Sequence, residues 1–437
     1  MLVRARPHLE NEELLQVLSS NVSVVDIEKF EIEFAEKIGL SRCYATHQGR
    51  DALALALKII GTKPGDEIIV PNFICSVVID SILSVGATPV LVDNSLTTFN
   101  VAVEDYERAI TPKTKALLAL HLYGIPSNAD QLKQLAIQKN CYLLEDCAHT
   151  LNSKIRGKNV GTFGDLSFFS FNFDKPMSLG QGGMLAVNNA MLNEAAEKIV
   201  GNTRRETLEE EKSILKSLLL QHFLTAEARY VRYLPIVFAM DAMRYFPGVS
   251  SRIDDFIRSG DFRILGRIAR QTGLLRVIRK MMKNVKSISR HPEPVLPLLM
   301  NALRAKFGTY QIKHLDAVEE RRRANSLAYQ KVFQATRDFQ LPLLSDSFFA
   351  SFSRFTVLTR DNEQRKQLIE KAKHCGVELD HGNWERTIAS TTGYLNKVRK
   401  VNNVLETSEE LAARILHLPT HYYVSAEHVD KINQIFE

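Results

Sequence analysis

The sequence predicts an α/β fold built around a mainly parallel β-sheet. Between residues 66 and 144, short apolar segments typical of strands alternate with amphipathic segments typical of helices. Such alternation indicates a parallel sheet covered by helices. The 437 residues, of which 45% are hydrophobic, are enough for one large and one small domain. The predicted strands cover 67–70, 88–92, 115–122 and 142–144, and the helices 76–85 and 129–138.

Two helices are expected before the alternating region, within residues 11–40. The second carries Phe30, Phe34 and Ile38 at helical spacing. We expect this pair to pack across the large domain or onto a partner subunit. A third, strongly helical segment follows at 52–60.

The C-terminal half predicts a second, smaller unit. A long helix is indicated at 302–333, followed by a strand at 352–358 and a helix at 365–375. The segment before them is also helical in pattern, with apolar residues three to four apart. We therefore divide the chain into a large domain at 1–200, a helical basic insertion at 201–294, and a small α+β C-terminal domain with its connecting helix at 295–437.

The basic charge of the chain is local. Residues 262–290 contain nine basic and no acidic side chains, whereas the formal net charge of the whole chain is +6. A basic amphipathic helix can lie on an anionic membrane surface, attract a diphosphate substrate, or be an ordinary solvated helix face. Nucleic-acid binding is not expected, because no reading motif accompanies the charge.

The composition favours a cytoplasmic protein without a metal site. The five cysteines are odd in number and include no CxxC pair, so neither a zinc site nor a disulfide framework is predicted. The N-terminal residues lack the apolar region of a signal peptide, and no apolar run approaches the roughly 20 residues that span a bilayer. We expect a protein that is not exported and does not cross a membrane.

One lysine occupies a position suited to chemistry. Lys175 follows the aromatic, β-prone segment 167–171, just before a proline that prevents the strand from continuing. Gly180, Gly182 and Gly183 come next, as expected where the backbone passes close to another group. A lysine at the end of a strand can form a Schiff base with an aldehyde cofactor. The sequence MLAV at 184–187 then predicts another strand.

Two further segments supply partners for such a cofactor. Asp146 ends the apolar segment YLLED, and a carboxylate there would pair with the ring nitrogen of a pyridine cofactor. Gly49, Arg50 and Asp51 open the helix at 52–60, and a helix N-terminus preceded by glycine is suited to a phosphate group. Because ligands of parallel sheets bind beyond the carboxyl ends of strands, the predicted fold and the cofactor interpretation agree.

An ordered set of motifs resembles one known family. The motifs are GRDALALAL at 49–57, PGDEIIVP at 64–71, HLYG at 121–124, EDCAH at 145–149, GTFGD at 161–165, and SFNFDK followed by GQGG. In this wording and order the chain resembles the DegT/DnrJ/EryC1/StrS sugar aminotransferases, which are fold-type-I enzymes that use pyridoxal 5′-phosphate (PLP). The resemblance is close from residue 31 to about 189 and looser from 303 onward.

The resemblance implies a function and a set of site residues. The implied activity is amino transfer from an amino acid, glutamate by resemblance, to a nucleotide-linked keto-sugar, for cell-surface polysaccharide or secondary-metabolite sugars. The implied assembly is a homodimer. Lys175 would bind PLP covalently and move the proton, and Asp146 would keep the ring nitrogen protonated. The cofactor-binding residues implied with them are Gly49, Arg50, Asp51, Cys75, His149, Ser170 and Asn172.

Three positions depart from the pattern of the family. Cys75 stands where many members place an aromatic ring on the cofactor, and Arg50 stands where a hydroxyl side chain is usual. Residues 294–299 read PVLPLL where members carry an Asn-x-Arg segment that reaches the phosphate of the partner subunit. The last departure suggests that Arg50 or a residue of the insertion takes over this contact.

Two other classes of function stay open on the sequence. One is a PLP enzyme of the same fold with another reaction, such as a sugar dehydratase or another transaminase. Members that dehydrate sugars replace the lysine by histidine, so Lys175 favours amino transfer. The other is a catalytically inactive relative that serves as a binding subunit, which the departures at Cys75 and at 294–299 suggest.

Overall fold

The computed structural model describes residues 2–226, 296–334, 336, 338–379, 386–401 and 405–436. The basic segment at 262–290 lies outside these ranges, as does most of the predicted insertion. Among the residues that the structure describes, no helix combines the length and the apolar character that a membrane span requires.

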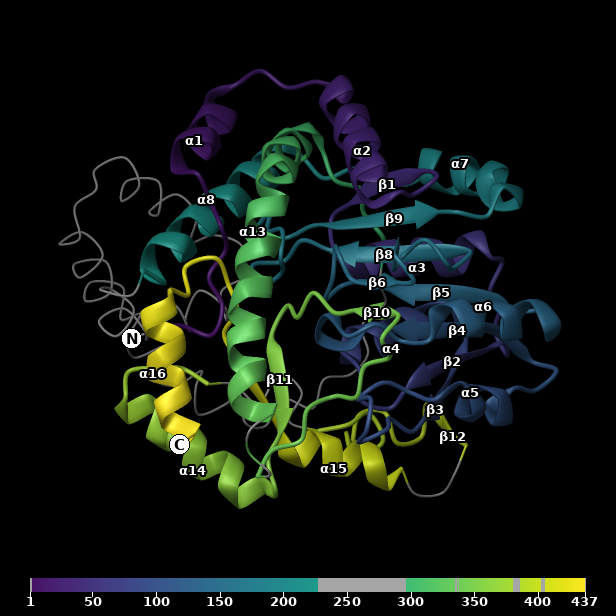
Figure 1. Cartoon of the computed structure of the whole chain (residues 1–437). Helices are drawn as coiled ribbons and strands as arrows, with labels where there is room; N and C mark the ends of the chain where they lie inside the picture. Colours follow the sequence, from purple (N-terminus) through teal and green to yellow (C-terminus); the bar gives the residue numbers. More distant parts are fainter. Residues whose placement is uncertain are drawn as a thin grey trace.

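A central eight-stranded sheet organises the structure (Figure 1). Its strands are β1 (Cys43–Thr46), β2 (Glu67–Pro71), β3 (Thr88–Val92), β4 (Thr114–Leu120), β5 (Tyr142–Asp146), β8 (Leu166–Ser170), β9 (Gly183–Val187) and β12 (Arg399–Lys400). The strand order is β1-β9-β8-β5-β4-β2-β3-β12. Neighbours from β12 to β8 are parallel, and only β9 runs antiparallel to both of its neighbours. The predicted mainly parallel sheet is therefore confirmed.

Apolar residues on both faces of the strands place the sheet between two hydrophobic cores. In β4, Leu117 faces one core and Leu118 the other, because successive side chains of a strand point to opposite faces. One face is covered by α3 (Gly49–Ile59), α4 (Ser76–Ser84) and α7 (Asn193–Gly201). The other is covered by α2 (Val24–Ile38), α5 (Val103–Ala109) and α6 (Ala129–Gln138).

The two predicted N-terminal helices are α1 (Asn11–Ser19) and α2. Helix α2 packs across the large sheet, with the ring of Phe34 5.1 Å from Phe169 and 5.4 Å from Phe171. It also packs on α13 (Ala302–Gln334), where a Cβ at Gly308 would lie 2.4 Å from the ring of Phe30. The close approach of these two helices therefore requires the glycine.

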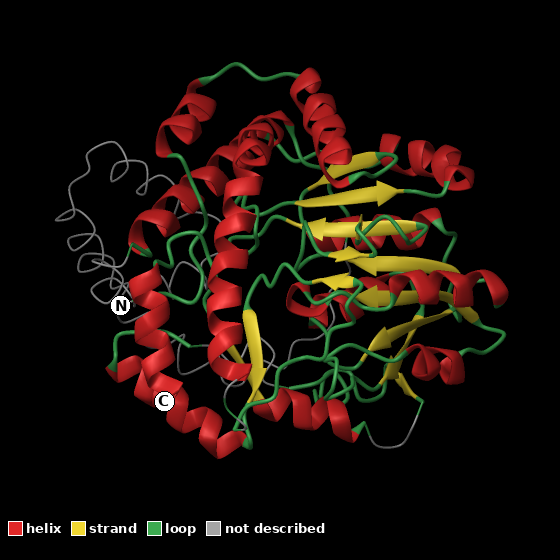
Figure 2. Cartoon of the chain, viewed as in Figure 1, coloured by secondary structure: helices red, strands yellow, loops and turns green. Residues whose placement is uncertain are grey.

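The C-terminal part combines helices with short strands, as predicted (Figure 2). Strands β11 (Phe355–Leu358) and β13 (Ile415–Leu418) form an antiparallel pair, and β10 (Phe348–Phe349) joins the hairpin of β6 (Lys154–Ile155) and β7 (Lys158–Asn159). Strand β12 from this part extends the central sheet. Within the ranges that the structure describes, the other helical elements are α8 (Leu208–Leu224), α14 (Asn362–His374), α15 (Glu406–Arg414), α16 (Ala426–Phe436), η1 (Leu122–Gly124) and η2 (Ala190–Leu192).

Candidate active site

The candidate site lies at the carboxyl ends of three adjacent strands, β4, β5 and β8. Figure 1 shows these ends directed toward the side of the molecule that holds α13 and β11. His121 follows β4, Asp146 ends β5 and Ser170 ends β8. The edge of a parallel sheet thus brings together residues that lie far apart in the sequence, in the place where such sheets bind ligands.

Asp146 is a buried carboxylate, with 3% of its surface exposed. Its Oδ1 accepts a hydrogen bond from the backbone N–H of Ala148 at 2.9 Å. Burial raises the pKa of Asp146 to about 6, although this hydrogen bond and the charge of Lys175 act in the opposite direction. The carboxylate is therefore short of positive charge, and a cation placed against it would stabilise the ionised form.

Lys175 lies in the loop between β8 and β9, where its backbone N–H donates to the carbonyl of Asn172 at 3.1 Å. Its side chain is half-buried. The ammonium group is close enough to shift the pKa values of Asp146, His149 and Asp174. Lys175 and Asp146 thus lie within electrostatic range of each other, and their joint role stays a prediction.

His149 joins this group as a neutral imidazole. Its Nδ1 accepts a hydrogen bond from the backbone N–H of Tyr123 at 3.2 Å, and the two rings stack at 5.1 Å with an angle of 9° between their planes. Burial, and then the charge of Lys175, hold the pKa of His149 well below its usual range. An imidazole that accepts at Nδ1 carries its proton on Nε2, so Nε2 can act as a donor.

A second aspartate stands directly before the lysine. Asp174 Oδ2 accepts from Arg354 Nη2 at 2.9 Å, and both side chains are largely buried. Burial alone would raise the pKa of Asp174, but Lys175 and Arg354 outweigh it and hold this pKa far below its usual range. Asp174 is therefore ionised at any physiological pH.

The start of α3 packs tightly against the ends of β8 and β9. A Cβ at Gly49 would lie 3.2 Å from the Cβ of Ser170, and a Cβ at Gly183 would lie 2.5 Å from the backbone carbon of Gln48. The side chain of Gln48, the N-cap residue of α3, makes no capping hydrogen bond. The first turn of α3 therefore offers backbone N–H groups beside the Ser170 side chain, an arrangement suited to a phosphate.

The other predicted residues take different positions around this centre. Arg50 is exposed to solvent. Asp51 is buried, and burial raises its pKa to about 6 while the backbone amides of Leu298 and Gln48 act in the opposite direction. Cys75 is half-buried and precedes α4, at the same sheet edge but beyond β4. Asn172 follows β8 and turns the chain toward Lys175 through its carbonyl.

The segment that departs from the family pattern is built into the edge of the large sheet. Leu298 accepts through its carbonyl from the backbone N–H of His47 at 2.9 Å, and Leu299 forms bridges with Thr46 and Arg205. Residues 298 and 299 thus pair with the segment just before α3 and with the chain at Arg205.

Arg304 lies in the first turn of α13, and its side chain is fully buried. Its guanidinium forms ion pairs with Glu206 and Glu211, and donates to the carbonyl of Gln181 at 2.6 Å. His47 Nδ1 bonds Glu206 Oε2 at 2.7 Å. Because two carboxylates already neutralise it, Arg304 acts as a structural tie between α13, α8 and the glycine-rich turn.

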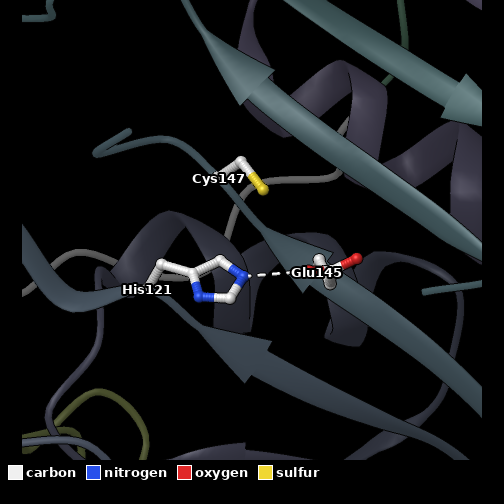
Figure 3. Close-up of side chains that lie close together, drawn as sticks. All are labelled: His121, Glu145 and Cys147. Atoms are coloured by element: carbon white, nitrogen blue, oxygen red, sulfur yellow. Dashed lines mark hydrogen bonds and ion pairs between the residues drawn. The ribbon is translucent and has the colours of Figure 1, made fainter. Parts of the chain in front are cut away.

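A histidine, a glutamate and a cysteine lie close together at the carboxyl ends of β4 and β5 (Figure 3). His121, Glu145 and Cys147 have ligand atoms within 4.8 Å of one another. His121 Nδ1 accepts from the backbone N–H of Ser127, so its Nε2 carries the proton and donates to Glu145 at 3.1 Å. Backbone N–H groups of Gly161, Phe163 and Gly164 also donate to Glu145, at 2.8, 2.7 and 2.5 Å. The Glu145 carboxylate therefore fixes the loop at 161–164 through these hydrogen bonds. Burial raises the pKa of the Cys147 thiol well above its usual range.

Three residues of the site were outside the sequence prediction. Tyr123 lies in the HLYG motif, and its ring stacks on His149. Asp174 stands inside the SFNFDK motif, beside the lysine. Arg354 is 180 residues from its partner Asp174, and no local pattern signals such a contact.

The chain belongs to the DegT/DnrJ/EryC1/StrS aminotransferase family, which it matches over residues 7–218 and 270–437. It is 43% identical over 166 residues to GDP-perosamine synthase of Escherichia coli O157:H7, which covers 38% of this chain and 46% of that protein. It is 39% identical over 163 residues to UDP-N-acetyl-3-dehydro-alpha-D-glucosamine 3-aminotransferase of Acidithiobacillus ferrooxidans, covering 37% of this chain and 44% of that protein. Each match thus spans less than half of the curated relative.

The fold is that of solved aminotransferases. The PLP form of Spr1654 from Streptococcus pneumoniae, assigned as a sugar aminotransferase, superimposes with a TM-score of 0.71 over 99% of this chain and 96% of that chain, at 19% identity. The predicted fold class, a fold-type-I α/β structure, is confirmed. The division into domains at 200 and 294 stays a prediction.

Proposed function

We propose that this chain is a PLP-dependent aminotransferase that converts a nucleotide-linked keto-sugar to an amino-sugar with an amino-acid donor, glutamate. Family membership supports the reaction type, and the named activities of the two curated relatives support a nucleotide-linked sugar as acceptor. The observation that carries the proposal is the convergence of Lys175 and Asp146 at the carboxyl edge of the sheet, beside the start of α3.

The residues at this edge fit PLP on three sides. The buried Asp146, whose pKa is raised to about 6 because burial is incompletely compensated, matches a protonated ring nitrogen. Gly49 and Ser170 present backbone N–H groups and a hydroxyl to a phosphate at the start of α3. Lys175 would hold the aldehyde carbon.

When bound, PLP supplies an aldehyde that takes up the amino group and a protonated ring that stabilises negative charge on the substrate carbon. The chain supplies the remainder. The amine of Lys175, when free, would take the proton from the substrate carbon and hold it for its return. The neutral imidazole of His149 offers a donor at Nε2, and its stacking on Tyr123 fixes the direction of that donor.

The decisive test is covalent labelling of the lysine. Purified protein is incubated with PLP, reduced with borohydride and mapped by peptide mass spectrometry. We expect one PLP group per chain, on Lys175, and a visible absorbance band before reduction. Lys175→Ala should remove both signals, whereas Lys198→Ala, which changes an exposed lysine of α7, should remove neither. Labelling elsewhere, or no band in the wild type, would contradict the proposal and favour an inactive binding subunit.

The reaction type is tested with substrates. PLP-loaded protein is incubated with glutamate and a panel of UDP-, GDP- and dTDP-linked keto-sugars, and the products are weighed by mass spectrometry. Amino transfer replaces the carbonyl oxygen of the sugar by an amino group and yields the keto acid of the donor. A sugar dehydratase would instead remove a hydroxyl group without adding nitrogen, so the product masses separate the two reactions.

We further propose a homodimer, which the resemblance to the family supports. Residues 298 and 299 belong to the segment that contacts the partner subunit in other family members. In this chain they pair with residues just before α3 of their own subunit, so this contact is not part of the argument for a dimer. Light scattering coupled to size-exclusion chromatography should give twice the mass of the 49.4 kDa chain. A monomer that still binds PLP would contradict the proposed dimer and leave the proposed reaction standing.

A further inference from the structure

Two histidine rings from different parts of the chain contact the ring of Tyr123. His149, which follows β5 of the large sheet, stacks on Tyr123 with 5.1 Å between the ring centroids and 9° between the ring planes. His417, in β13 of the C-terminal part, has its ring centroid 4.1 Å from that of Tyr123, at an angle of 55°. Tyr123 therefore connects a residue of the candidate site with the β11–β13 pair.

The backbone of Tyr123 is held in an unusual conformation. Its φ and ψ angles are 52° and 24°, in the left-handed region that residues other than glycine rarely adopt. In this conformation its N–H donates to Nδ1 of His149 at 3.2 Å, and its carbonyl accepts from the N–H of Ser353 at 3.0 Å. A strained backbone persists only where the surrounding contacts impose it, and such residues gather at functional sites.

The C-terminal part docks closely on the loop that holds Tyr123. The N–H of Ser351 donates to the carbonyl of Gly124 at 3.1 Å. A Cβ at Gly124 would lie 2.8 Å from the backbone nitrogen of Phe352 and 2.8 Å from Oγ of Ser351. Oγ of Ser153 lies 2.7 Å from the carbonyl oxygen of Gly124 and 2.9 Å from Oγ of Ser351. A shift of the C-terminal part would therefore move this loop.

His417 has a fixed position within the C-terminal part. It lies directly opposite Thr356 in the β11–β13 pair, and its Nδ1 is 3.0 Å from Oγ1 of Thr356. Only 2% of the surface of His417 is exposed, and Thr356 is fully buried. The ring of His417 cannot turn away from Tyr123 without losing this hydrogen bond. A residue that orients another needs such support from its own neighbours.

We propose that His417 is a positioning residue for His149 and acts through Tyr123. The ring of His417 holds the ring of Tyr123. Tyr123 in turn fixes the plane of the His149 imidazole by stacking, and its backbone N–H fixes which nitrogen of His149 carries the proton. The inference rests on the proposed function, in which His149 faces the cofactor, and deepens it because the C-terminal part then sets the direction of the Nε2 donor.

A direct electrostatic effect of His417 on His149 is the alternative explanation. Burial is the main cause that lowers the pKa of His149, and the charge of Lys175 adds to it. A charge on His417 acts in the same direction. Such an effect needs no contact with Tyr123. Phenylalanine keeps a ring at position 417 and carries no charge, so His417→Phe separates the two explanations.

The first measurement observes His149 in the PLP-free protein. NMR spectra of protein labelled at its histidine nitrogens report which ring nitrogen carries the proton, and His149→Gln identifies the signal. We expect a single Nε2–H form in the wild type and a mixture of both forms in His417→Leu. His417→Phe should keep the single form. Thr356→Val, which removes the hydroxyl partner of His417 and keeps the ring, should give an intermediate result.

The second measurement is a double-mutant cycle on the affinity for PLP. His417→Leu should weaken PLP binding by roughly 2- to 10-fold, the worth of one aromatic contact. Tyr123→Asn removes the ring but suits the left-handed backbone and keeps the N–H. In that background, His417→Leu should have little further effect. His374→Leu, a change at an exposed histidine of α14, is the matched control and should bind PLP as the wild type does.

The outcomes separate this inference from the proposed function. An unchanged His149 signal in His417→Leu overturns it, as does a change in His417→Phe as large as in His417→Leu. Equal weakening of PLP binding by His417→Leu with and without Tyr123→Asn also overturns it, because the coupling then bypasses Tyr123. If His417→Leu does not fold, Thr356→Val replaces it in both measurements under the same criteria. A wild type that takes up no PLP but shows the expected His149 signals overturns the proposed function and leaves the coupling of the rings standing.

Discussion

Replacing Asp146 by asparagine should stabilise the PLP-free protein and weaken its hold on PLP. The pKa of this carboxyl rises from its ordinary value of 3.8 to about 6 on folding. Because each pKa unit corresponds to about 1.4 kcal/mol, the ionised carboxylate costs the folded state about 3 kcal/mol at pH 8 and roughly half of that at pH 5. The folded state binds the proton more readily, so the contribution of this carboxyl to stability is largest below pH 4 and is lost as the pH rises through 6.

Asparagine removes the charge and keeps the acceptor for the backbone N–H of Ala148, which lies 2.9 Å from Oδ1. The free energy of unfolding is measured in urea on PLP-free protein at pH 5 and pH 8. The gain from Asp146→Asn over the wild type should grow by about 1 to 2 kcal/mol between these pH values. Asp316→Asn, a change at an exposed aspartate, provides the control and should show no such growth.

The same variant should lose affinity for PLP by roughly 10- to 100-fold, the worth of a charged hydrogen bond. Equilibrium titration of the visible absorbance band measures it. The opposite signs of the two effects are the essential part of the prediction. If Asp146→Asn destabilises the PLP-free protein at pH 8, or if it gains stability without losing PLP, then burial of an undercompensated charge is not what prepares this residue for a cation.

The remaining predictions concern the scaffold and are checked by chemical unfolding and PLP titration. Gly183→Ala places a Cβ 2.5 Å from the backbone of Gln48, so it should lower the free energy of unfolding by about 3 kcal/mol and weaken the binding of PLP. Gly201→Ala is the control, because its Cβ meets no atom within 4 Å and the free energy of unfolding should change little. Glu145→Gln leaves buried backbone N–H groups facing an amide and should cost about 3–5 kcal/mol. Arg304→Met leaves the buried carboxylates of Glu206 and Glu211 without their cation and should lower the free energy of unfolding by a similar amount. Adding Glu206→Gln should restore part of that free energy, because it removes one of the unpaired charges.

The sequence revealed those parts of the fold whose signals are local. The segment at 142–144 is a run of apolar residues, and the helix that begins at Gly49 is rich in alanine and leucine, so both were recognisable. Strand β1 has the mixed sequence CYAT and forms because β9 pairs with it. The two-residue strand β12 likewise exists only through its pairing with β3. Elements that tertiary pairing creates leave no pattern of their own.

The same distinction applies to the site. Asp146 and Lys175 could be placed together from the sequence, because each ends or follows a strand and parallel strands share one carboxyl edge. Arg354 could not, because the contact with Asp174 depends on how the C-terminal part docks on the large sheet. For Arg50 the motif predicted the position in the chain but not the direction of the side chain. The residue lies at the start of α3 as expected, and its side chain is exposed to solvent.

The two aspartates near Lys175 have opposite electrostatic environments, and this polarity gives the site a direction. Asp146 is buried with too little positive charge around it, which raises its pKa to about 6, whereas Asp174 is held far below its usual pKa by Lys175 and Arg354 despite burial. The first end is therefore stabilised by an added cation and the second by an added anion.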